Sequence, residues 1–586
     1  MIGSLKQTVK PFWRHVHHRL KTKSRVDNLK DNAGSLYCSD QEKATLLNEF
    51  FSSVFTVECV DYIPDFDERF TGNALLDITI SPDTVRTQLK RLKATGAPGP
   101  DGVHPQILRE AADQLCTPLA SLFQRSIDSG TLPAIWKTAS VVPVYKKGDK
   151  QSPGNYRPIS LTSIVCRTLE AIIRDHLMQH MTVNNLFTEA QHGFRPHRSC
   201  DTQLIEMLDD WSRYIEDGEP IDCVYLDFQK AFDSVPHKRL LKKLEGYGVH
   251  GTLLSWIRGF LSDRQQRVVI NGCESPWAPV VSGVPQGSVL GPVLFLVYIN
   301  DLPLEVNSKT KMFADDTKLY APSKVAGSAL RLQEDINRVT NWSDAWQLPF
   351  NTTKCTVLHV GPGNAHHQYT MRGATLQETD AEKDLGVKVD THLKFRDHAA
   401  AAASKGNQIL AVIRRSFRRI DKTTLPILYK TLVRPHLEYG NLSWGPFNRA
   451  DQILLEKVQR RATRLVRSIR HLPYSERLRQ LEIPSLYYRR RRGDMIRLYQ
   501  IFNSAVDLEH TQLFERDTSN RTRGHPFKLL KPRADTRVRR HAFGVRSIND
   551  WNGLPAQVVT APSTSSFKAR LDTHWAASVY YCPDTD

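Results

Sequence analysis

The chain has 586 residues, 40% of them hydrophobic and 24% charged, which is longer than one ordinary domain and apolar enough to bury sizeable cores. The longest apolar run, residues 293–299, is too short to cross a bilayer, and residues 1–25 are basic and interrupted by Pro11 and Trp13, so we expect neither a membrane-spanning segment nor a signal peptide. The formal net charge of +18 at pH 7 indicates a polyanionic partner.

The positive charge is concentrated in one part of the chain. Residues 411–540 hold about 30 Lys and Arg against about 12 Asp and Glu, an excess equal to that of the entire chain. A solvated helical surface is the ordinary explanation of a charged run, but an excess this uneven favours a nucleic-acid surface. The nine cysteines show no Cys-x-x-Cys pair and no Cys/His cluster at zinc spacing, which predicts reduced, buried thiols in an intracellular protein of the nucleus, the cytoplasm or both.

The N-terminal part is predicted to be helical. Residues 1–40 are basic and polar and are expected to be loosely ordered. A helix is predicted from Asp40 to Phe55, with Asp40 as its N-cap. Apolar residues at helical spacing in residues 118–136, ending with Trp136, indicate a further helical face that belongs to the core.

Two strand-like runs with basic residues come next. Residues 139–149 end in a basic tip that contains Lys146 and Lys147, and residues 155–161 contain Arg157. Ammonium and guanidinium groups neutralise phosphate oxygens, so a hairpin of this kind suits the binding of a nucleoside triphosphate. A surface hairpin with incidental charge is the alternative.

Three aspartates predict a metal site. Residues 221–226 are strand-like and end at Asp227, and about ninety residues later two half-apolar runs flank Asp315 and Asp316 as a hairpin with both carboxylates at its tip. An Asp pair alone is often only a solvated turn. Adjacent carboxylates repel, however, so a site that keeps them together needs a cation, for which Mg²⁺ is the obvious candidate. With Asp227 beside them, the three could hold two ions for in-line phosphoryl transfer.

Between these aspartates lies a Gly/Pro-rich segment, residues 282–292, where backbone can approach a ligand closely and Gln286 supplies a donor and an acceptor. Three segments, in this order, resemble the palm motifs of reverse transcriptases: residues 227–233, 283–292 and 313–316. The surrounding sequence, from around Asn48 to Trp575, most resembles retrotransposons without long terminal repeats, of the chicken-repeat and jockey-like kind.

The resemblance implies an α+β, right-hand polymerase fold. It implies a helical extension in residues 41–136, fingers and an antiparallel palm in residues 137–390, a helical thumb in residues 391–480 and a basic, mainly helical C-terminal domain in residues 481–586. The implied activity is RNA-directed DNA synthesis, in which a primer 3′-OH is extended with dNTPs on an RNA template. The implied partners are template RNA, primer DNA and a ribonucleoprotein with the element's own RNA, with no membrane and with the oligomeric state left open.

The resemblance also implies roles for individual residues. Asp227, Asp315 and Asp316 are carried over as catalytic ligands of two Mg²⁺ ions, with Mn²⁺ as a substitute, and Lys354 as a catalytic lysine near the leaving pyrophosphate. Phe232 matches the residue that blocks a ribose 2′-OH, although a core aromatic is the alternative. The dNTP contacts carried over are Lys146, Lys147, Arg157, Phe228, Phe232, Pro285, Gln286 and Gly287. Where relatives often have Gly, this sequence has His197, so an altered loop is expected there.

The C-terminal third reads as basic helices. Residues 384–387 resemble a hairpin that supports the primer end. Apolar residues from Leu455 to Leu465 recur at helical spacing, and the opposite face predicts a nucleic-acid surface made of Lys457, Arg460, Arg461, Arg464 and Arg467. Arginine clusters at residues 489–492 and 537–540 extend this prediction. Nearby Tyr487, Tyr488 and Tyr499 could stack on bases, but packing is favoured for most of them.

Two other readings remain at this stage. One is a catalytically inactive, nucleic-acid-binding remnant of a retroelement, and the other is an RNA polymerase built on the same palm. The intact aspartates argue against the first, and Phe232 argues against the second. Related elements commonly encode an endonuclease ahead of the polymerase, for which the residues before Asp40 leave no room. We therefore expect copying from a given primer without the ability to start integration.

Overall fold

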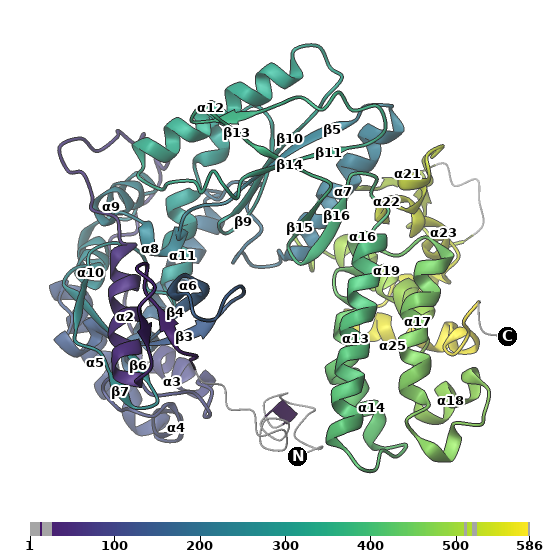
Figure 1. The fold of residues 1–586 in the computed structure, drawn as a ribbon, viewed down its shortest axis with the longest axis horizontal. Helices are drawn as coiled ribbons and strands as arrows, with labels where there is room; N and C mark the ends of the chain where they lie inside the picture. The colour runs from purple at the N-terminus through teal and green to yellow at the C-terminus, as the bar shows by residue number, and fades with distance from the viewer. Residues whose placement is uncertain (1–11, 14–25, 509–512, 519–523, 584–586) are drawn as a thin grey trace.

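The computed structural model describes residues 12–13, 26–508, 513–518 and 524–583. Much of the N-terminal segment that was expected to be loosely ordered lies outside these residues. The described chain forms an open arch (Figure 1). A five-stranded sheet, the central sheet, stands at the crown, and an arm built on a second sheet descends on one side. An arm of long helices descends on the other side; we call the two the sheet-bearing arm and the helical arm.

The sheet-bearing arm is built on the predicted hairpin of two antiparallel strands, β3 and β4. β6 lies parallel to β3 and carries β7 and β8 as antiparallel partners. Val141 of β3 and Val268 of β6 are buried against Leu47 and Phe51 of helix α2, so alternate strand positions form this core. The strands are β3 (Thr138–Tyr145), β4 (Tyr156–Leu161), β6 (Arg264–Ile270), β7 (Cys273–Glu274) and β8 (Ala278–Val280).

Helix α2 starts with a different cap from the one predicted. Ser39, and not Asp40, is the N-cap: its hydroxyl accepts the N–H of Glu42, whose carboxylate accepts the N–H of Ser39. This capping box leaves Asp40 as the first helical residue, where a carboxylate favours the helix dipole. The helices of this arm are α2 (Asp40–Ser53), α3 (Pro82–Arg91), α4 (Pro105–Glu110), α5 (Ala112–Ser129), α6 (Ile164–Val183) and α10 (Gly251–Leu261).

The helical face predicted across residues 118–136 is divided between two elements. Helix α5 ends at Ser129, because Gly130 follows in the left-handed conformation with φ 63°. Trp136 lies in a separate 3₁₀ turn, Ala134–Lys137, and returns to pack its ring against Phe123 with ring centroids 6.0 Å apart. Trp136 is therefore a core residue, as expected, but not a residue of that helix.

The central sheet has the strand order β14-β11-β5-β10-β9. The pairs β9–β10, β10–β5 and β5–β11 are antiparallel, as predicted, but the edge strand β14 runs parallel to β11, so the sheet is mixed. The chain leaves β11, forms a small hairpin of β12 and β13, and returns in the same direction. The strands are β5 (Ile221–Leu226), β9 (Lys309–Phe313), β10 (Asp316–Pro322), β11 (Thr356–Val360), β12 (Thr370–Met371), β13 (Ala374–Thr375) and β14 (Gln377–Thr379).

Both faces of the central sheet are covered, because side chains alternate between them. Cys223 of β5 lies in the buried cluster that includes Trp211 of helix α7, and Val224 lies in the cluster of the other face, which includes Val339 of helix α12. Helix α11 is apolar almost throughout and is therefore buried on nearly all sides. The remaining helices of this region are short. The elements are α7 (Cys200–Glu216), α8 (Ala231–Ser234), α9 (His237–Gly246), α11 (Gly291–Ile299) and α12 (Ser328–Ala345).

The helical arm follows a second small hairpin, β15 and β16. Its two long helices, α13 and α17, pack on each other, and Ala403 and Val458 contribute to one shared core. Helix α17 ends at Thr463, so Leu465 and Arg467 lie beyond the helix that was predicted to carry them. The elements are β15 (Ala381–Asp384), β16 (Val387–Asp390), α13 (Arg396–Ser416), α14 (Thr424–Leu428), α15 (Arg434–Glu438), α16 (Asn441–Trp444), α17 (Arg449–Thr463) and α18 (Tyr474–Leu481).

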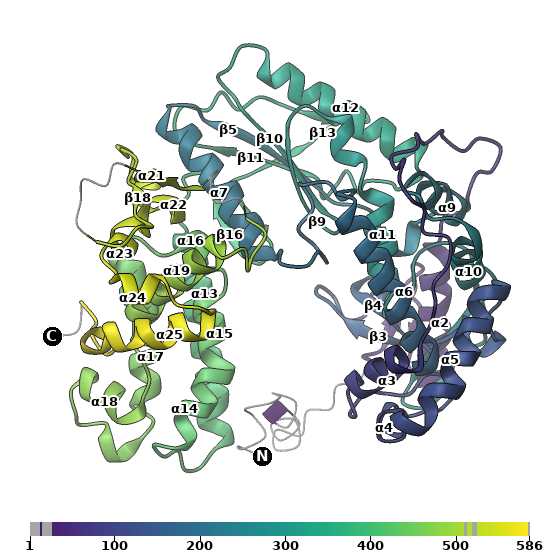
Figure 2. The ribbon, with the colours of Figure 1, turned by 180° about the vertical axis from the view of Figure 1, so that it is seen from behind.

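The C-terminal helices lie beside the helical arm and reach back to helix α7 (Figure 2). They enclose their own core around Trp551 and Phe567. Tyr488 and Tyr499 are buried in this region and hydrogen-bond Asp572 and the Ala561 carbonyl, so these two tyrosines pack, as favoured. The helices are α19 (Leu486–Phe502), α21 (Arg537–His541), α22 (Phe543–Arg546), α23 (Ile548–Asn552), α24 (Ala556–Val559) and α25 (Thr564–His574).

Two expectations about the chain as a whole can be compared with the structure. No helix among the described residues is long and apolar enough to span a membrane. Five of the cysteines are buried, as expected, but Cys38 and Cys59 are exposed and Cys200 and Cys273 are half-buried, so the expectation that the thiols are buried is wrong for these four.

Candidate active site

The predicted carboxylates meet at one end of the central sheet. Asp227 directly follows β5, and β10 pairs with β5 so that Thr317 lies opposite Leu226. The same register, continued by one residue, sets Asp316 opposite Asp227, and Asp315 precedes Asp316 in the turn of the β9–β10 hairpin. Directly opposed residues of an antiparallel pair present their side chains on one face. The hairpin with the aspartate pair at its tip is confirmed.

The electrostatics of these carboxylates favour a bound cation. Burial raises the pKa of Asp315, and the neighbouring Asp227 raises it further. Asp316 remains exposed to solvent, yet the protein packed around it, followed by the charges of Asp315 and Asp384, raises its pKa to about 6. Burial above all, and then the neighbouring carboxylates, destabilise the anionic forms, which a bound cation would stabilise. The donors are carboxylate oxygens, which fit a hard ion such as Mg²⁺ or Mn²⁺.

Lys354 lies beside this group of acids. Its Nζ atom is 3.4 Å from Oδ2 of Asp227, and the two side chains are 60% and 43% exposed. The register of β11 with β5, in which Thr356 lies opposite Tyr225, brings Lys354 to this position. An exposed ion pair contributes only roughly 0–1 kcal/mol, so the ammonium can turn to another anion at little cost.

The turn that carries Asp315 is supported from the side. Ala314 has the left-handed φ of 55°, and its N–H donates to Oε1 of Gln191 at 2.9 Å. The same oxygen accepts the N–H of Gly193 at 2.8 Å. A side chain at position 193 is excluded, because its Cβ would lie 2.4 Å from the nitrogen of Ala314. Gln191, which is buried, therefore holds the hairpin turn, a role that the sequence analysis did not predict.

Comparison with known proteins agrees with this geometry. A family model described as "Reverse transcriptase (RNA-dependent DNA polymerase)" matches residues 144–389, the segment that contains all three aspartates. The matched residues 144–389 form a reverse transcriptase domain. The chain is similar to the "RNA-directed DNA polymerase from mobile element jockey" of Drosophila melanogaster, with 28% identity over 417 residues that cover 69% of this chain and 45% of the relative.

Two further relatives support a mobile-element origin. The jockey polymerase of Drosophila funebris is 27% identical over 504 residues, covering 80% of this chain and 53% of the relative. The "Probable RNA-directed DNA polymerase from transposon BS" of Drosophila melanogaster is 29% identical over 410 residues, covering 66% and 44%. These relatives come from elements without long terminal repeats, the group that the motifs of this chain indicated. The chain spans about half the length of these relatives.

Most of the residues predicted to contact dNTP surround one cavity. The cavity has a volume of about 430 Å³, within the range of small-molecule sites. It lies between the β3–β4 hairpin and the end of β5, and Asp227, Asp315 and Lys354 open into it. The predicted residues that line it are Lys146, Arg157, Phe228, Phe232, Pro285, Gln286 and Gly287. Lys147 does not line it and instead lines an adjoining cavity beside Asp316 and Lys354.

The basic side chains of this cavity repel one another. Burial and then the nearby charges of Arg157, Lys354 and Lys147 lower the pKa of Lys146. Lys230, which also lines the cavity, has its pKa lowered by burial, although Asp233 opposes the shift. Within the described residues, neither Lys146 nor Arg157 forms an ion pair with a carboxylate. Cations gathered in this way favour an anionic ligand.

Phe232 and Gln286 have defined positions on the cavity wall. Phe232 is half-buried and stacks on Phe295, with ring centroids 4.5 Å apart, so it both packs and faces the cavity. The Gln286 amide donates to both carboxylate oxygens of Asp233 at 3.0 Å. Burial raises the pKa of Asp233 to about 6. Gly287 is required because a Cβ there would lie 2.4 Å from the carbonyl oxygen of Ser160 on β4.

The hairpin predicted at residues 384–387 is formed by β15 and β16 and borders the adjoining cavity, whose volume is about 390 Å³. Asp384 forms a buried ion pair with Lys318, which lies two residues after Asp316 on the same face of β10. The Tyr439 hydroxyl of the helical arm donates to the Leu385 carbonyl at 2.7 Å. The β15–β16 hairpin is therefore bound both to strand β10 and to the helical arm.

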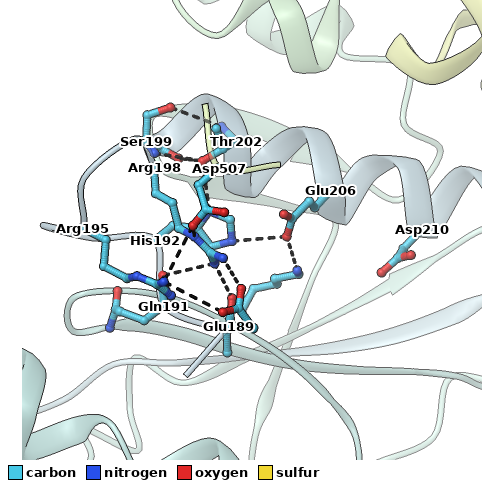
Figure 3. A network of polar contacts seen from close by, with 12 residues as sticks. Glu189, Gln191, His192, Arg195, Arg198, Ser199, Thr202, Glu206, Asp210 and Asp507 are labelled. Atoms are coloured by element: carbon cyan, nitrogen blue, oxygen red, sulfur yellow. Dashed lines mark hydrogen bonds and ion pairs between the residues drawn. The ribbon is translucent and has the colours of Figure 1, made fainter. Parts of the chain in front are cut away.

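A polar network surrounds the segment that carries His197 (Figure 3). Arg198 pairs with Glu189 and donates to Oδ2 of Asp507 at 2.6 Å. His197 adopts a left-handed φ of 61°, and its carbonyl accepts the N–H of Asp507 at 3.0 Å. His197 therefore occupies a backbone conformation that glycine adopts without strain, and the altered loop stays a prediction.

The same network reaches strand β9 of the hairpin that carries Asp315 and Asp316. Buried His192 lies 3.2 Å from the Glu206 carboxylate, which also pairs with Lys311 of β9. Burial opposes ionisation of Glu206, but His192 and Lys311 outweigh it and lower the pKa of Glu206 to about 2. Helix α7, which carries Glu206, is therefore tied to the hairpin that presents the aspartates.

The predicted nucleic-acid surface is only partly available. Lys457, Arg461 and Arg464 are exposed and recur at helical spacing along and just past α17. Arg467 is also exposed, but it begins a separate 3₁₀ turn. Arg460 is half-buried with its guanidinium 5.0 Å from the Tyr474 ring centroid, so it packs against α18 and does not share this surface.

The clustered arginines at residues 489–492 and 537–540 mostly bind carboxylates of the protein itself, so they do not extend this surface as predicted. In the first cluster, Arg489 pairs with Glu438, Arg491 with Asp550 and Arg492 with Asp572. In the second, Arg539 donates to buried Asp209 at 2.6 Å. A charge run in a sequence does not reveal such pairings, because the partners lie 50 to several hundred residues away.

Proposed function

We propose that this chain is an RNA-directed DNA polymerase that extends a primer 3′-OH with dNTPs on an RNA template. The observation that carries the proposal is the meeting of Asp227, Asp315 and Asp316 at one end of the central sheet. They lie beside a cavity lined by Lys146 and Arg157, neither of which has an ion-pair partner in the described part of the chain. The membership of residues 144–389 in the reverse transcriptase family supports the same reaction. In this reading the sheet-bearing arm is the fingers, the central sheet the palm and the helical arm the thumb.

The residues present fit two Mg²⁺ ions, for which Mn²⁺ could substitute. Asp227, Asp315 and Asp316 would hold them, because these carboxylates crowd one another and offer oxygen ligands. When bound, such ions activate the attacking hydroxyl and neutralise charge on the transferring phosphate.

The protein's own groups would position the reactants. Lys146 and Arg157 face the cavity from the β3–β4 hairpin and would bind the triphosphate oxygens. Phe232, held by its stack on Phe295, would exclude a ribose 2′-OH by contact. Lys354 is placed to leave Asp227 for the leaving pyrophosphate and to donate a proton to it. Gln286 is oriented by Asp233 and Gly287 by its contact with β4.

The nucleic acid would lie within the arch. The β15–β16 hairpin borders the cavity beside Asp316 and would support the primer end. Lys457, Arg461 and Arg464 would contact backbone phosphates without reading sequence. A ribonucleoprotein with the element's own RNA would be the working form.

The test is primer extension by the purified chain on a primed RNA template with dNTPs and Mg²⁺. The wild-type chain should extend the primer, and Asp315→Asn combined with Asp316→Asn should abolish extension while RNA binding persists. Asp380→Asn is the matched control, since this exposed palm aspartate lies outside the cavities and should leave extension unchanged. If the double variant still extends the primer, the assignment of the metal ligands is wrong. If the wild-type chain binds RNA but never extends a primer, the chain is an inactive binding remnant.

A further inference from the structure

A second group of potential metal ligands lies at the opposite end of the palm sheet. His359 of β11, His366 of the following loop and Glu378 of β14 each offer one ligand atom, and these atoms lie within 4.8 Å of one another. The imidazole rings of His359 and His366 have centroids 4.6 Å apart. The sequence analysis found no metal-ligand spacing here, because the third ligand comes from a neighbouring strand.

The register of the sheet explains why these side chains converge. Glu378 pairs with Val357 in the parallel β14–β11 ladder, and His359 lies two residues further along β11, so both side chains project from one face. His359 pairs with Asp222 of β5 on that same face. Asp222 and Asp227 are five residues apart on one strand, which corresponds to roughly 17 Å, so this group is separate from the catalytic aspartates.

His359 is held in place by a buried carboxylate. Its Nδ1 atom lies 2.7 Å from Oδ1 of Asp222, and the two side chains are only 2% and 1% exposed. This contact leaves Nε2 of His359 for a ligand. A metal-binding histidine usually has its other ring nitrogen bonded to a carboxylate or carbonyl, which fixes its orientation. Tyr369 donates its hydroxyl to the same carboxylate at 2.6 Å, so Asp222 is itself fixed.

His366 is directed toward the group by its loop. It has a left-handed φ of 53°, a conformation that costs a non-glycine residue of the order of 1 kcal/mol or more. Its N–H donates to Oδ1 of Asn364, and the amide of Asn364 donates in turn to Asp222 at 2.8 Å. Nδ1 of His366 lies 2.5 Å from Oε1 of Glu378, a hydrogen bond whose proton a metal ion would replace.

We propose that His359, His366 and Glu378 form a binding site for Zn²⁺ or a similar borderline divalent transition-metal ion, with a water molecule as fourth ligand. Two imidazoles and one carboxylate are a ligand set that suits Zn²⁺ and not Mg²⁺. Bonds of roughly 2.0–2.2 Å require ligand atoms about 3.3 Å apart, which the exposed side chains of His366 and Glu378 can reach by small movements. The ion ties the loop after β11 and the edge strand β14 to the palm sheet.

The experiment uses the full chain carrying Asp315→Asn and Asp316→Asn, which removes the catalytic cation site, and is done in excess Mg²⁺. Co²⁺ serves as the spectroscopic probe for Zn²⁺. One equivalent should bind with the intense visible bands of a tetrahedral site, and excess Zn²⁺ should displace it. At a Zn²⁺ concentration 100 times the dissociation constant, the folding equilibrium should shift by about 100-fold in favour of the folded chain.

His366→Asn and Glu378→Gln are the informative variants, because both side chains are exposed and neither change should unfold the protein. His366→Asn also tolerates the left-handed backbone. Each should lower Co²⁺ affinity by at least about 10-fold and remove the shift of the folding equilibrium that Zn²⁺ causes. His471→Gln, which changes an exposed histidine of the helical arm, should alter neither. If no equivalent of Co²⁺ binds, or if both variants bind it as tightly as the parent chain, the three residues form no metal site.

Discussion

Asp233, which is not one of the three aspartates proposed to bind metal ions, orients a side chain of the neighbouring cavity wall. It is buried, its carboxylate accepts both hydrogen bonds of the Gln286 amide, and burial raises its pKa to about 6. The folded protein thus holds this carboxylate as an anion at neutral pH at a cost in stability. The anion in turn fixes the orientation of Gln286 on the wall of the cavity beside the three aspartates.

Asp233→Asn should therefore stabilise the folded chain near pH 7.5 by roughly 1–3 kcal/mol, which corresponds to the raised pKa. The sign follows from the shift. A carboxyl group with a raised folded pKa binds its proton more tightly in the folded state, so wild-type stability falls as pH rises from about 4 to about 6. The advantage of Asp233→Asn should accordingly vanish near pH 4. Denaturant unfolding of the wild type and of Asp233→Asn at several pH values measures the difference in their free energies of unfolding. A difference that does not change with pH would show that Asp233 does not titrate in this way.

At the scale of elements, the turn of the β9–β10 hairpin is held in place by a segment from outside the central sheet. Residues 190–193 lie beside β9, where the N–H of His192 donates to the Met312 carbonyl and the N–H of Met312 donates to Ala190. Gln191 adds the hydrogen bond to Ala314 in the turn itself. A two-residue turn with a left-handed alanine is strained when isolated, so this lateral support defines where Asp315 and Asp316 stand.

Gln191→Leu should slow primer extension by about 10-fold or more while RNA binding stays near that of the wild type. The change leaves the N–H groups of Ala314 and Gly193 without their acceptor, at about 1–3 kcal/mol each, and 1.4 kcal/mol in the barrier is tenfold in rate. Gln203→Leu is a matched control, since Gln203 is equally buried and its amide has no hydrogen-bond partner among the described residues. Single-turnover extension should separate the two, and equal rates would show that Gln191 only packs.

At the scale of the whole molecule, the positive charge of the C-terminal third serves two purposes. Part of it holds the molecule together, because Arg497 pairs with Asp201 and Arg539 with Asp209, both on helix α7. The N–H of Thr536 also donates to Glu216 at the end of α7, so the C-terminal helices are attached along the length of this helix (Figure 2). Another part, on and after α17, remains exposed and is available to phosphates.

These two kinds of charge should respond differently to substitution. Replacing Lys457, Arg461 and Arg464 with Gln should flatten the salt dependence of RNA binding by a log–log slope of roughly 0.7–0.9 for each phosphate that is no longer neutralised, while stability is unchanged. Arg539→Gln should leave that slope unchanged and instead destabilise the fold by up to about 3–5 kcal/mol, because buried Asp209 loses one of its two arginine partners and keeps only the more exposed Arg213. Binding at several salt concentrations and thermal unfolding measure both effects. An unchanged slope in the triple variant would move the nucleic-acid path away from α17.

The sequence by itself determined the local elements of the site. The strand before Asp227, the hairpin around Asp315 and Asp316 and the β3–β4 hairpin follow from alternating apolar residues and turn chemistry, which act between near neighbours. The order of these motifs also sufficed to recognise the family. Boundaries were less certain, as Ser39 in place of Asp40 and the end of α17 at Thr463 show, because caps compete within one or two residues.

Tertiary structure alone decided which basic side chains are exposed to a ligand and which are paired with carboxylates of the protein itself. Arg491 and Arg539 look like phosphate ligands in the sequence but are paired with carboxylates that the fold brings to them. No local sequence pattern predicted the role of Gln191 or the grouping of His359, His366 and Glu378. Both depend on strand register and on loops that bring together residues far apart in the sequence. The periodicity of apolar residues determines which face of a strand or helix a side chain occupies. Packing between distant segments determines which residue that side chain contacts.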